Sequence, residues 1–311
     1  MPKIERSTMD YLKKVEHLNM TYSVDMLRLS TRITYNQFSE LEFRFKTLYP
    51  YSVKKYYEST VLRDFKYNYI FTDKELRQPG DDFFEQREEH TFWLGFLHNT
   101  EISSSENAKF NLTIEFNPNK LKDFSLILCV LGSFGGWKLK SYDLAIDVPI
   151  NILDICLPDK KRKKDLRIFS NGFDDLTYYI GRSNGRVKIY NKKKESHLDI
   201  SGELTRIETT IEYDGYDIEK IQFYHLDKEF IELFTNEYLY TFKDYDDKTL
   251  FAVLYALQCG FDPNMLTRAY KQKVKQLLEG GHKLIFKKSC AETVLKQVIV
   301  YYFVNNKHMI I

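Results

Sequence analysis

Alternation of apolar and polar residues runs through roughly the first two thirds of this chain, and it constrains the fold more than any other feature. Successive side chains of a strand point to opposite faces, so alternating segments are predicted to be half-buried strands. The expected strands are Tyr22–Ser30, Thr91–His98, Lys109–Asn117, Lys138–Val148, Leu176–Arg182, Arg186–Lys192 and Leu204–Tyr213.

Helical periodicity dominates the last third of the chain and also appears in two earlier segments. The expected helices are Asn36–Phe45, Lys120–Gly132, Ile218–Leu233, Lys248–Cys259, Asn264–Leu278 and Ala291–Phe303. We therefore expect an α+β fold with a central antiparallel sheet that carries the active site, and a helical C-terminal section packed beside it. The expected division is a catalytic domain over residues 1–214 and a helical section over residues 215–311.

The two halves of the strand-rich region share a layout. Tyr22–Asp25 is followed by a helix and then by paired strands that end at Glu115, and Ser141–Asp143 is followed by paired strands that end at Glu208. This layout indicates an internal β-α-β-β duplication. The alternative is a strand order shared by chance.

Composition excludes several classes of protein. No apolar stretch approaches the roughly 18 residues that a membrane-spanning helix needs, and the first residues resemble no signal peptide. The 4 cysteines form no CxxC pair, which argues against a disulfide framework and a structural zinc site. We expect a cytoplasmic protein with no membrane partner. The net charge is only +2, so affinity for nucleic acid would depend on where the charges lie.

The segment from Thr177 to Lys194 is typical of a β-hairpin, because Asn184-Gly185 supplies the positive φ that tight turns require. Strand alternation places Arg186, Lys188, Tyr190 and Lys192 on one face. Neighbouring segments place Asp143 with Asp147, and Arg206 with Glu208 and Glu212, on polar faces. Tyr190 is thus expected on a face that holds both cations and carboxylates.

Phosphodiester transfer through a tyrosine needs such a mixture. Cations contact the phosphate, and carboxylates bind the divalent metal that stabilises the transition state. Nearby cations and metal would also help a phenol, whose usual pKa is near 10, to ionise. The alternative is a solvated sheet face with scattered ion pairs, which alternation by itself does not exclude.

Ordered motifs in this sequence resemble those of the Rep_trans family, the replication initiators of small antibiotic-resistance plasmids in Gram-positive bacteria. The residues that carry the resemblance are Leu112–Leu121, Tyr142–Asp147, Tyr178–Arg182 with Arg186–Lys193, and Arg206–Glu208. In that family the tyrosine of the Ile-Tyr-Asn-Lys motif, here Tyr190, takes the 5′ phosphate of the nicked strand. The resemblance implies a protein that nicks and rejoins DNA to start rolling-circle replication, through a 5′-phosphotyrosine intermediate.

The resemblance also implies a metal, Mg²⁺ or Mn²⁺, held by acidic residues. The candidate ligands are Glu115, Asp143, Asp147, Glu208 and, as a weaker fifth, Asp25. The catalytic cations expected beside Tyr190 are Arg186, Lys188 and Arg206. The implied partners are double-strand origin DNA, single-stranded DNA, a host DNA helicase and a second copy of the chain.

Several basic residues are candidate DNA contacts. Those near the motif are Arg182, Lys192 and Lys193; Arg268, Lys271 and Lys275 share one face of the expected C-terminal helix. The family associates origin recognition with its C-terminal region, so we expect this helix to read duplex DNA, although a basic helix face is also common on ordinary proteins. Two other functions stay open: a relaxase of an integrative or conjugative element, and a DNA-binding regulator of replication without catalytic activity.

Overall fold

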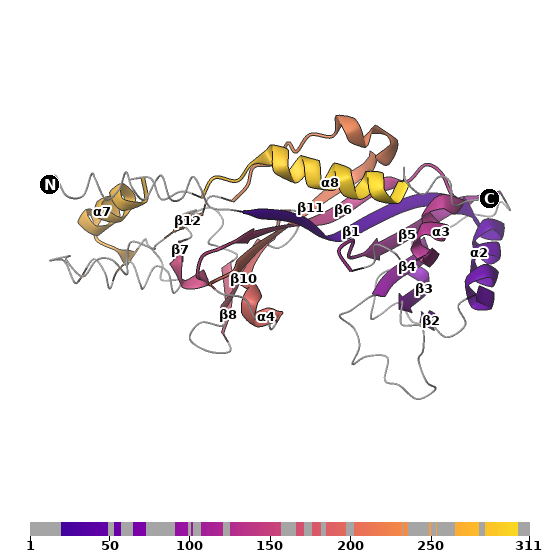
Figure 1. The fold of residues 1–311 in the computed structure, drawn as a ribbon, viewed down its shortest axis with the longest axis horizontal. Helices are drawn as coiled ribbons and strands as arrows, with labels where there is room; N and C mark the ends of the chain where they lie inside the picture. The colour runs from indigo at the N-terminus through magenta and orange to yellow at the C-terminus, as the bar shows by residue number, and fades with distance from the viewer. Residues whose placement is uncertain are drawn as a thin grey trace. The chain divides into compact units, whose positions relative to one another are not determined.

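The computed structural model describes residues 20–48, 53–56, 65–72, 91–98, 101, 107–120, 125–156, 166–170, 176–181, 185–196, 202–231, 233–235, 249, 253, 265–279 and 284–303. These residues form the expected α+β fold, with a large antiparallel sheet of ten strands, a second sheet of two strands, and several helices (Figure 1).

The ten-stranded sheet has the order β2-β3-β4-β5-β1-β6-β11-β10-β9-β8. Its strands are β1 (Thr21–Thr34), β2 (Val53–Tyr56), β3 (Phe65–Thr72), β4 (Thr91–His98), β5 (Lys109–Phe116), β6 (Lys138–Val148), β8 (Leu166–Ser170), β9 (Leu176–Ile180), β10 (Val187–Asn191) and β11 (Thr205–Asp217). The small sheet pairs β7 (Ile155–Cys156) with β12 (Phe234–Thr235).

The strand order repeats, as the duplicated layout of the sequence predicted. In the first half, β1 lies beside β5, and β4, β3 and β2 follow outward; in the second half, β6 lies beside β11, and β10, β9 and β8 follow outward. Among the described residues, a long helix follows the first strand in the first half alone, namely α2 (Tyr35–Leu48). The second half has at that place the single 3-10 turn η1 (Ile152–Asp154).

The chain forms two compact units. The first-half unit contains residues 23–144, 211–225 and 289–311, and the second-half unit contains residues 1–22, 145–210 and 226–288. Strands β6 and β11 each contribute residues to both units.

Two helices cover one face of the sheet in the first-half unit. On α2, Phe38 stacks on Phe96 of β4, with ring centroids 3.9 Å apart. On α8 (Lys288–Phe303), Tyr302 packs against Phe116 of β5, with the ring centroids 5.0 Å apart. The buried residues of α8 are Ala291, Leu295, Ile299 and Tyr302, a spacing that lines one helix face. A third helix, α3 (Ser125–Ser133), precedes β6.

The second-half unit positions β10 between two neighbours. Val187 and Ile189 are fully buried, and β10 pairs with β9 on one side and β11 on the other. Gly185 has φ of +84° just before the strand, a conformation that glycine adopts at little cost. The short helix α4 (Lys192–Glu195) follows β10 directly and is capped by the Asn191 side chain, which accepts from Lys194 N at 3.1 Å.

Some expected elements differ from the observed ones. The expected helix over Ile218–Leu233 is wrong: only the 3-10 turn η3 (Ile218–Phe223) forms, and extended backbone begins at Tyr224. Tyr224 is buried there with its hydroxyl bonded to that of Tyr142 at 2.7 Å, a tertiary contact that outweighs helical periodicity. The sequence analysis missed strands β2, β3 and β8 of the large sheet and both strands of the small sheet.

The C-terminal helices agree with expectation where they are described. Helix α7 (Arg268–Glu279) and helix α8 fall within a few residues of the expected bounds. The expected helix over Lys248–Cys259 lies almost wholly outside the described residues. Among the described helices, none combines the length and apolar character needed to cross a membrane.

Candidate active site

Tyr190 lies on β10 between two partner strands that surround it with charged groups. Its cross-strand partner on β11 is Arg206, and the next pair on the same face is Lys188 with Glu208. Directly paired residues share a face of the sheet, so these four side chains point the same way. The predicted alternation is confirmed at this point, since Val187 and Ile189 form core on the other face.

The Tyr190 hydroxyl donates a short hydrogen bond to a carboxylate oxygen, Oε1, of Glu208. Lys188 covers the ring from above, with its Nζ 3.9 Å from the ring centroid, and it also lies 3.9 Å from the second carboxylate oxygen of Glu208. Tyr190 is only 3% exposed. The phenol is therefore held in a fixed position, next to a base and beneath a cation.

Burial and the Glu208 carboxylate together raise the pKa of Tyr190 far above its ordinary value of 10.0, while the Arg206 guanidinium lowers it. The sequence had led us to expect that neighbouring cations would favour ionisation. Arg206 acts in that direction, but loss of solvation and the adjacent negative charge of Glu208 outweigh it, so the pKa of Tyr190 is raised. Ionisation of Tyr190 thus requires that its proton be taken up as it leaves.

Arg206 is fixed by a bidentate ion pair with Asp147 of β6. Its Nε and Nη2 donate to the two carboxylate oxygens of Asp147 at 2.6 and 2.7 Å. The side chains are 12% and 16% exposed, so this is a largely buried pair whose planar geometry holds the guanidinium firmly. The Arg206 side chain therefore lies on the same face of the sheet as Tyr190 and Glu208, and Asp147 holds it in place.

The remaining expected metal ligands lie in the first-half unit. Glu115 accepts a hydrogen bond from Nε of Arg28 at 2.7 Å, and Asp25 accepts one from Asn119 at 3.3 Å. Asp143 is half-buried on β6. Within the described part of the chain, no three His, Cys, Asp or Glu side chains gather as a metal site would require.

The donors near Tyr190 nevertheless suit a metal that is shared with DNA. Mg²⁺ is usually held by one or two carboxylates, with phosphate and water oxygens filling its other positions. Glu208 bonds to Tyr190 through Oε1 and has Lys188 3.9 Å from its other oxygen, whereas both oxygens of Asp147 accept from Arg206. Glu208 is thus the residue beside Tyr190 that fits this ion best.

The expected DNA contacts are dispersed. Lys192 donates to Glu195 at 2.7 Å, and Lys193 donates to the Gly202 carbonyl at 3.0 Å. Arg186 is exposed just before β10. On α7, Arg268 is exposed and Lys271 is half-buried; the Lys275 side chain and all of Arg182 lie outside the described residues.

The sequence analysis missed an aromatic group on the same face of the sheet. Tyr179 of β9 pairs with Lys188, and Arg167 of the edge strand β8 pairs with Tyr179. Phe169, two residues further on β8, is 57% exposed. Its ring meets that of Tyr179 edge to face, with the ring centroids 5.5 Å apart. Alternation in Leu-Arg-Ile-Phe-Ser (166–170) was the pattern that could have revealed this strand.

The first half of the sheet lacks the equivalent chemistry. Glu115 on β5 pairs with Trp93 on β4, as Glu208 on β11 pairs with Lys188 on β10. Two residues beyond Trp93, where the second half has Tyr190, stands Gly95. A Cβ at Gly95 would lie 2.5 Å from the Trp93 ring, so no side chain fits there. The duplicated layout therefore has a tyrosine at this position in the second half alone.

Comparison with known proteins adds little to this picture. No family model matches the sequence, and no curated protein does. The fold is similar to a solved rolling circle replication initiator protein from Geobacillus stearothermophilus, with a TM-score of 0.35 and 14% identity over 63% of this chain and 76% of that chain. A likeness at that score shows nothing about function.

Proposed function

We propose that this protein nicks one strand of DNA and rejoins it, with Tyr190 as the nucleophile, and that it initiates rolling-circle replication of a plasmid. The observation that carries the proposal is the Tyr190 hydroxyl bonded to Glu208, with Lys188 over the ring and Arg206 opposite. A nucleophile, a base and two cations on one sheet face are the groups that phosphodiester transfer requires. The four sequence motifs that resemble Rep_trans initiators support the same reading.

The proposed reaction begins with removal of the phenol proton. Glu208 takes the proton along the hydrogen bond already formed, and the Tyr190 oxygen attacks the phosphorus. The bond from phosphorus to the 3′ oxygen breaks, and that oxygen takes a proton from solvent water to leave as a 3′ hydroxyl. The 5′ phosphate is then joined to Tyr190, and attack by a 3′ hydroxyl reverses these steps and rejoins the strand.

The surrounding cations bind and orient the phosphate. Arg206, held by Asp147, offers a fixed guanidinium, while Lys188 offers a mobile ammonium. Because Lys188 covers the Tyr190 ring, the lysine side chain has to swing aside before DNA reaches the hydroxyl. A Mg²⁺ or Mn²⁺ ion bound to Glu208 and DNA would add positive charge for the pentavalent phosphate.

The exposed Phe169 beside Tyr179 suits a single strand, because bases stack on aromatic rings without regard to sequence. Arg167 on the same face would contact the backbone. We propose that the strand to be cut lies across β8 and β9 toward Tyr190. The resemblance further suggests a bacterial cytoplasmic homodimer that binds a plasmid origin and a host DNA helicase.

The test is a search for the covalent intermediate. Purified protein is incubated with supercoiled plasmids that carry candidate origins, with Mn²⁺ or Mg²⁺, and the products are separated in denaturing detergent. We expect nicked circles and a protein–DNA adduct whose peptide map contains Tyr190. Origin binding without an adduct would instead identify a regulator, and cleavage at a transfer origin would identify a relaxase.

A further inference from the structure

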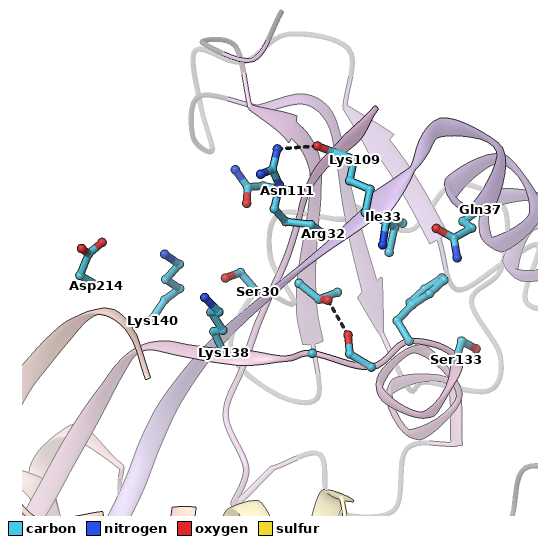
Figure 2. A pocket seen from close by; sticks show the side chains of 14 residues that line it. Ser30, Arg32, Ile33, Gln37, Lys109, Asn111, Ser133, Lys138, Lys140 and Asp214 are labelled. Atoms are coloured by element: carbon cyan, nitrogen blue, oxygen red, sulfur yellow. Dashed lines mark hydrogen bonds between the residues drawn. The ribbon is translucent and has the colours of Figure 1, made fainter. Parts of the chain in front are cut away.

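A cationic hollow lies in the first-half unit, and the proposed chemistry makes no use of it. It measures about 680 Å³ (Figure 2). Its charged lining residues are Arg32, Lys109, Lys138, Lys140 and Asp214. Four cationic side chains thus stand against the single carboxylate of Asp214, in a protein whose positive and negative charges nearly balance.

The two lysines of β6 lack ion-pair partners within the described part of the chain. No hydrogen bond or salt bridge joins the side chain of Lys138 or Lys140 to another described residue. Figure 2 shows both side chains extending from β6 toward the side of the hollow where Arg32 lies. Two neighbouring ammonium groups repel each other, and an anion placed between them would relieve that repulsion.

The backbone of β11 leaves space for these lysines. Gly215 has φ of +93°, and a Cβ built on it would lie 3.1 Å from Cδ of Lys138 and 3.5 Å from Nζ of Lys140. Any other residue would be strained in that conformation, and its Cβ would crowd the Lys138 side chain. The glycine thus lets the lysines lie over the strand and face the hollow.

Arg32 on the other side of the hollow is held in position. Its Nη2 donates to the Lys109 carbonyl at 2.6 Å, and Glu101 lies 3.9 Å away. Glu101 offsets part of the Arg32 charge, but its carboxylate also accepts from the backbone and side-chain nitrogens of Asn111. Arg32 itself remains exposed, with its other donors available.

We propose that this hollow binds phosphates of the DNA backbone at a distance along the strand from the phosphate that Tyr190 attacks. The volume exceeds that of a single inorganic anion and suits a nucleotide-sized stretch of chain. The exposed Arg32, Lys138 and Asp214 show that the hollow opens to solvent, as a polymer that enters and leaves requires. The proposal rests on the proposed function only in naming DNA as the polymer.

The test compares salt dependence of DNA binding in matched variants. A labelled 30-nucleotide strand and a 30-base-pair duplex are titrated with the full chain, without divalent metal, at several NaCl concentrations. Log K falls as log [NaCl] rises. Each phosphate contact increases the magnitude of this negative slope by about 0.7 for a single strand and by about 0.9 for a duplex. For Lys138→Gln/Lys140→Gln we expect the magnitude of the slope to decrease by about 1.4 with the single strand and by about 1.8 with the duplex.

Two controls keep the result interpretable. Lys66→Gln/Lys220→Gln removes the same charge from exposed lysines outside the lining and should leave the slope nearly unchanged. Lys138→Arg/Lys140→Arg retains the charge and should keep the wild-type slope, which excludes misfolding of the segment as the cause. Thermal melting checks that every variant is folded.

Equal slope losses in the Lys66/Lys220 and Lys138/Lys140 variants would overturn the proposal, because total charge would then explain the effect. Tight binding of AMP or ATP that the Lys138/Lys140 variant loses, with an unchanged DNA slope, would also overturn it, since the occupant would be a free nucleotide. If the Lys138/Lys140 variant has a smaller salt slope but the protein forms no Tyr190 adduct, DNA binding by the hollow is supported and the nicking function is rejected. If the adduct forms but the Lys138/Lys140 variant keeps the wild-type slope, the nicking function is supported and DNA binding by the hollow is rejected.

Discussion

Replacing Tyr190 by Phe removes one oxygen and leaves the ring that packs in the site. The Glu208 carboxylate loses the proton donor it holds, and the proposed nucleophile disappears. We expect no covalent adduct and no nicking of supercoiled DNA, while the affinity for origin DNA stays close to that of the wild type. Gel analysis of the adduct and a binding titration measure the two outcomes separately.

The same change has a predictable effect on stability. A hydrogen bond to a charged group contributes about 1.5 to 3 kcal/mol, and Tyr190 is 3% exposed, so little water replaces the lost partner. Lys188, 3.9 Å from Glu208, can move closer and recover part of that loss. We expect Tyr190→Phe to lower the free energy of unfolding by about 1 to 2 kcal/mol, measured by urea denaturation.

Alkaline pH gives an independent measure of the buried phenol. The pKa of Tyr190 is raised in the folded protein, and in the unfolded chain it is about 10. Below pH 10 both states hold the proton; above it the unfolded state loses the proton first, so wild-type stability falls by about 1.4 kcal/mol per pH unit. Tyr190→Phe lacks this pH dependence, so its stability deficit relative to the wild type should shrink from about pH 10 upward and then reverse. Tyr142, whose pKa is also raised by burial, remains in both proteins and cancels.

Tyr178→Phe is the matched control. Tyr178 is 2% exposed on β9 and pairs with Ile189, so it lies on the opposite face of the sheet from Tyr190. It should lose some stability and keep full nicking activity. Normal adduct formation by Tyr190→Phe, or equal loss of nicking in both variants, would refute the assignment of the nucleophile.

Three further changes test the surroundings of the site. Asp147→Ala leaves Arg206 buried without its partner and should cost about 3 to 5 kcal/mol, whereas Asp147→Asn should cost less; an unchanged urea midpoint would contradict the ion pair. Glu208→Gln should abolish nicking, and a chelator should do the same to the wild type; cleavage that persists in EDTA would show that no metal takes part. Phe169→Ala should weaken single-strand binding by about 1 to 3 kcal/mol, with Ile168→Ala, on the other face, as the control.

The sequence by itself determined the periodic elements and which residues share a face. Alternation around Tyr190 follows from the geometry of a strand, so Val187 and Ile189 were predictable as core before any pairing was known. The repeated strand order was also visible as a repeated layout. Helix α8 was predictable because its buried residues follow the helical period.

Tertiary structure alone decided how the charged residues combine. The sequence did not rank the four main candidate acids. The register of β10 and β11 places Glu208 beside Tyr190, whereas Asp147 pairs with Arg206. Register and burial depend on contacts between residues distant along the chain, which periodicity does not encode. For the same reason Tyr190, expected on a polar face, is buried with a raised pKa. The chain is likewise extended from Tyr224, where a helix was expected, because the buried Tyr224 hydroxyl bonds to that of Tyr142.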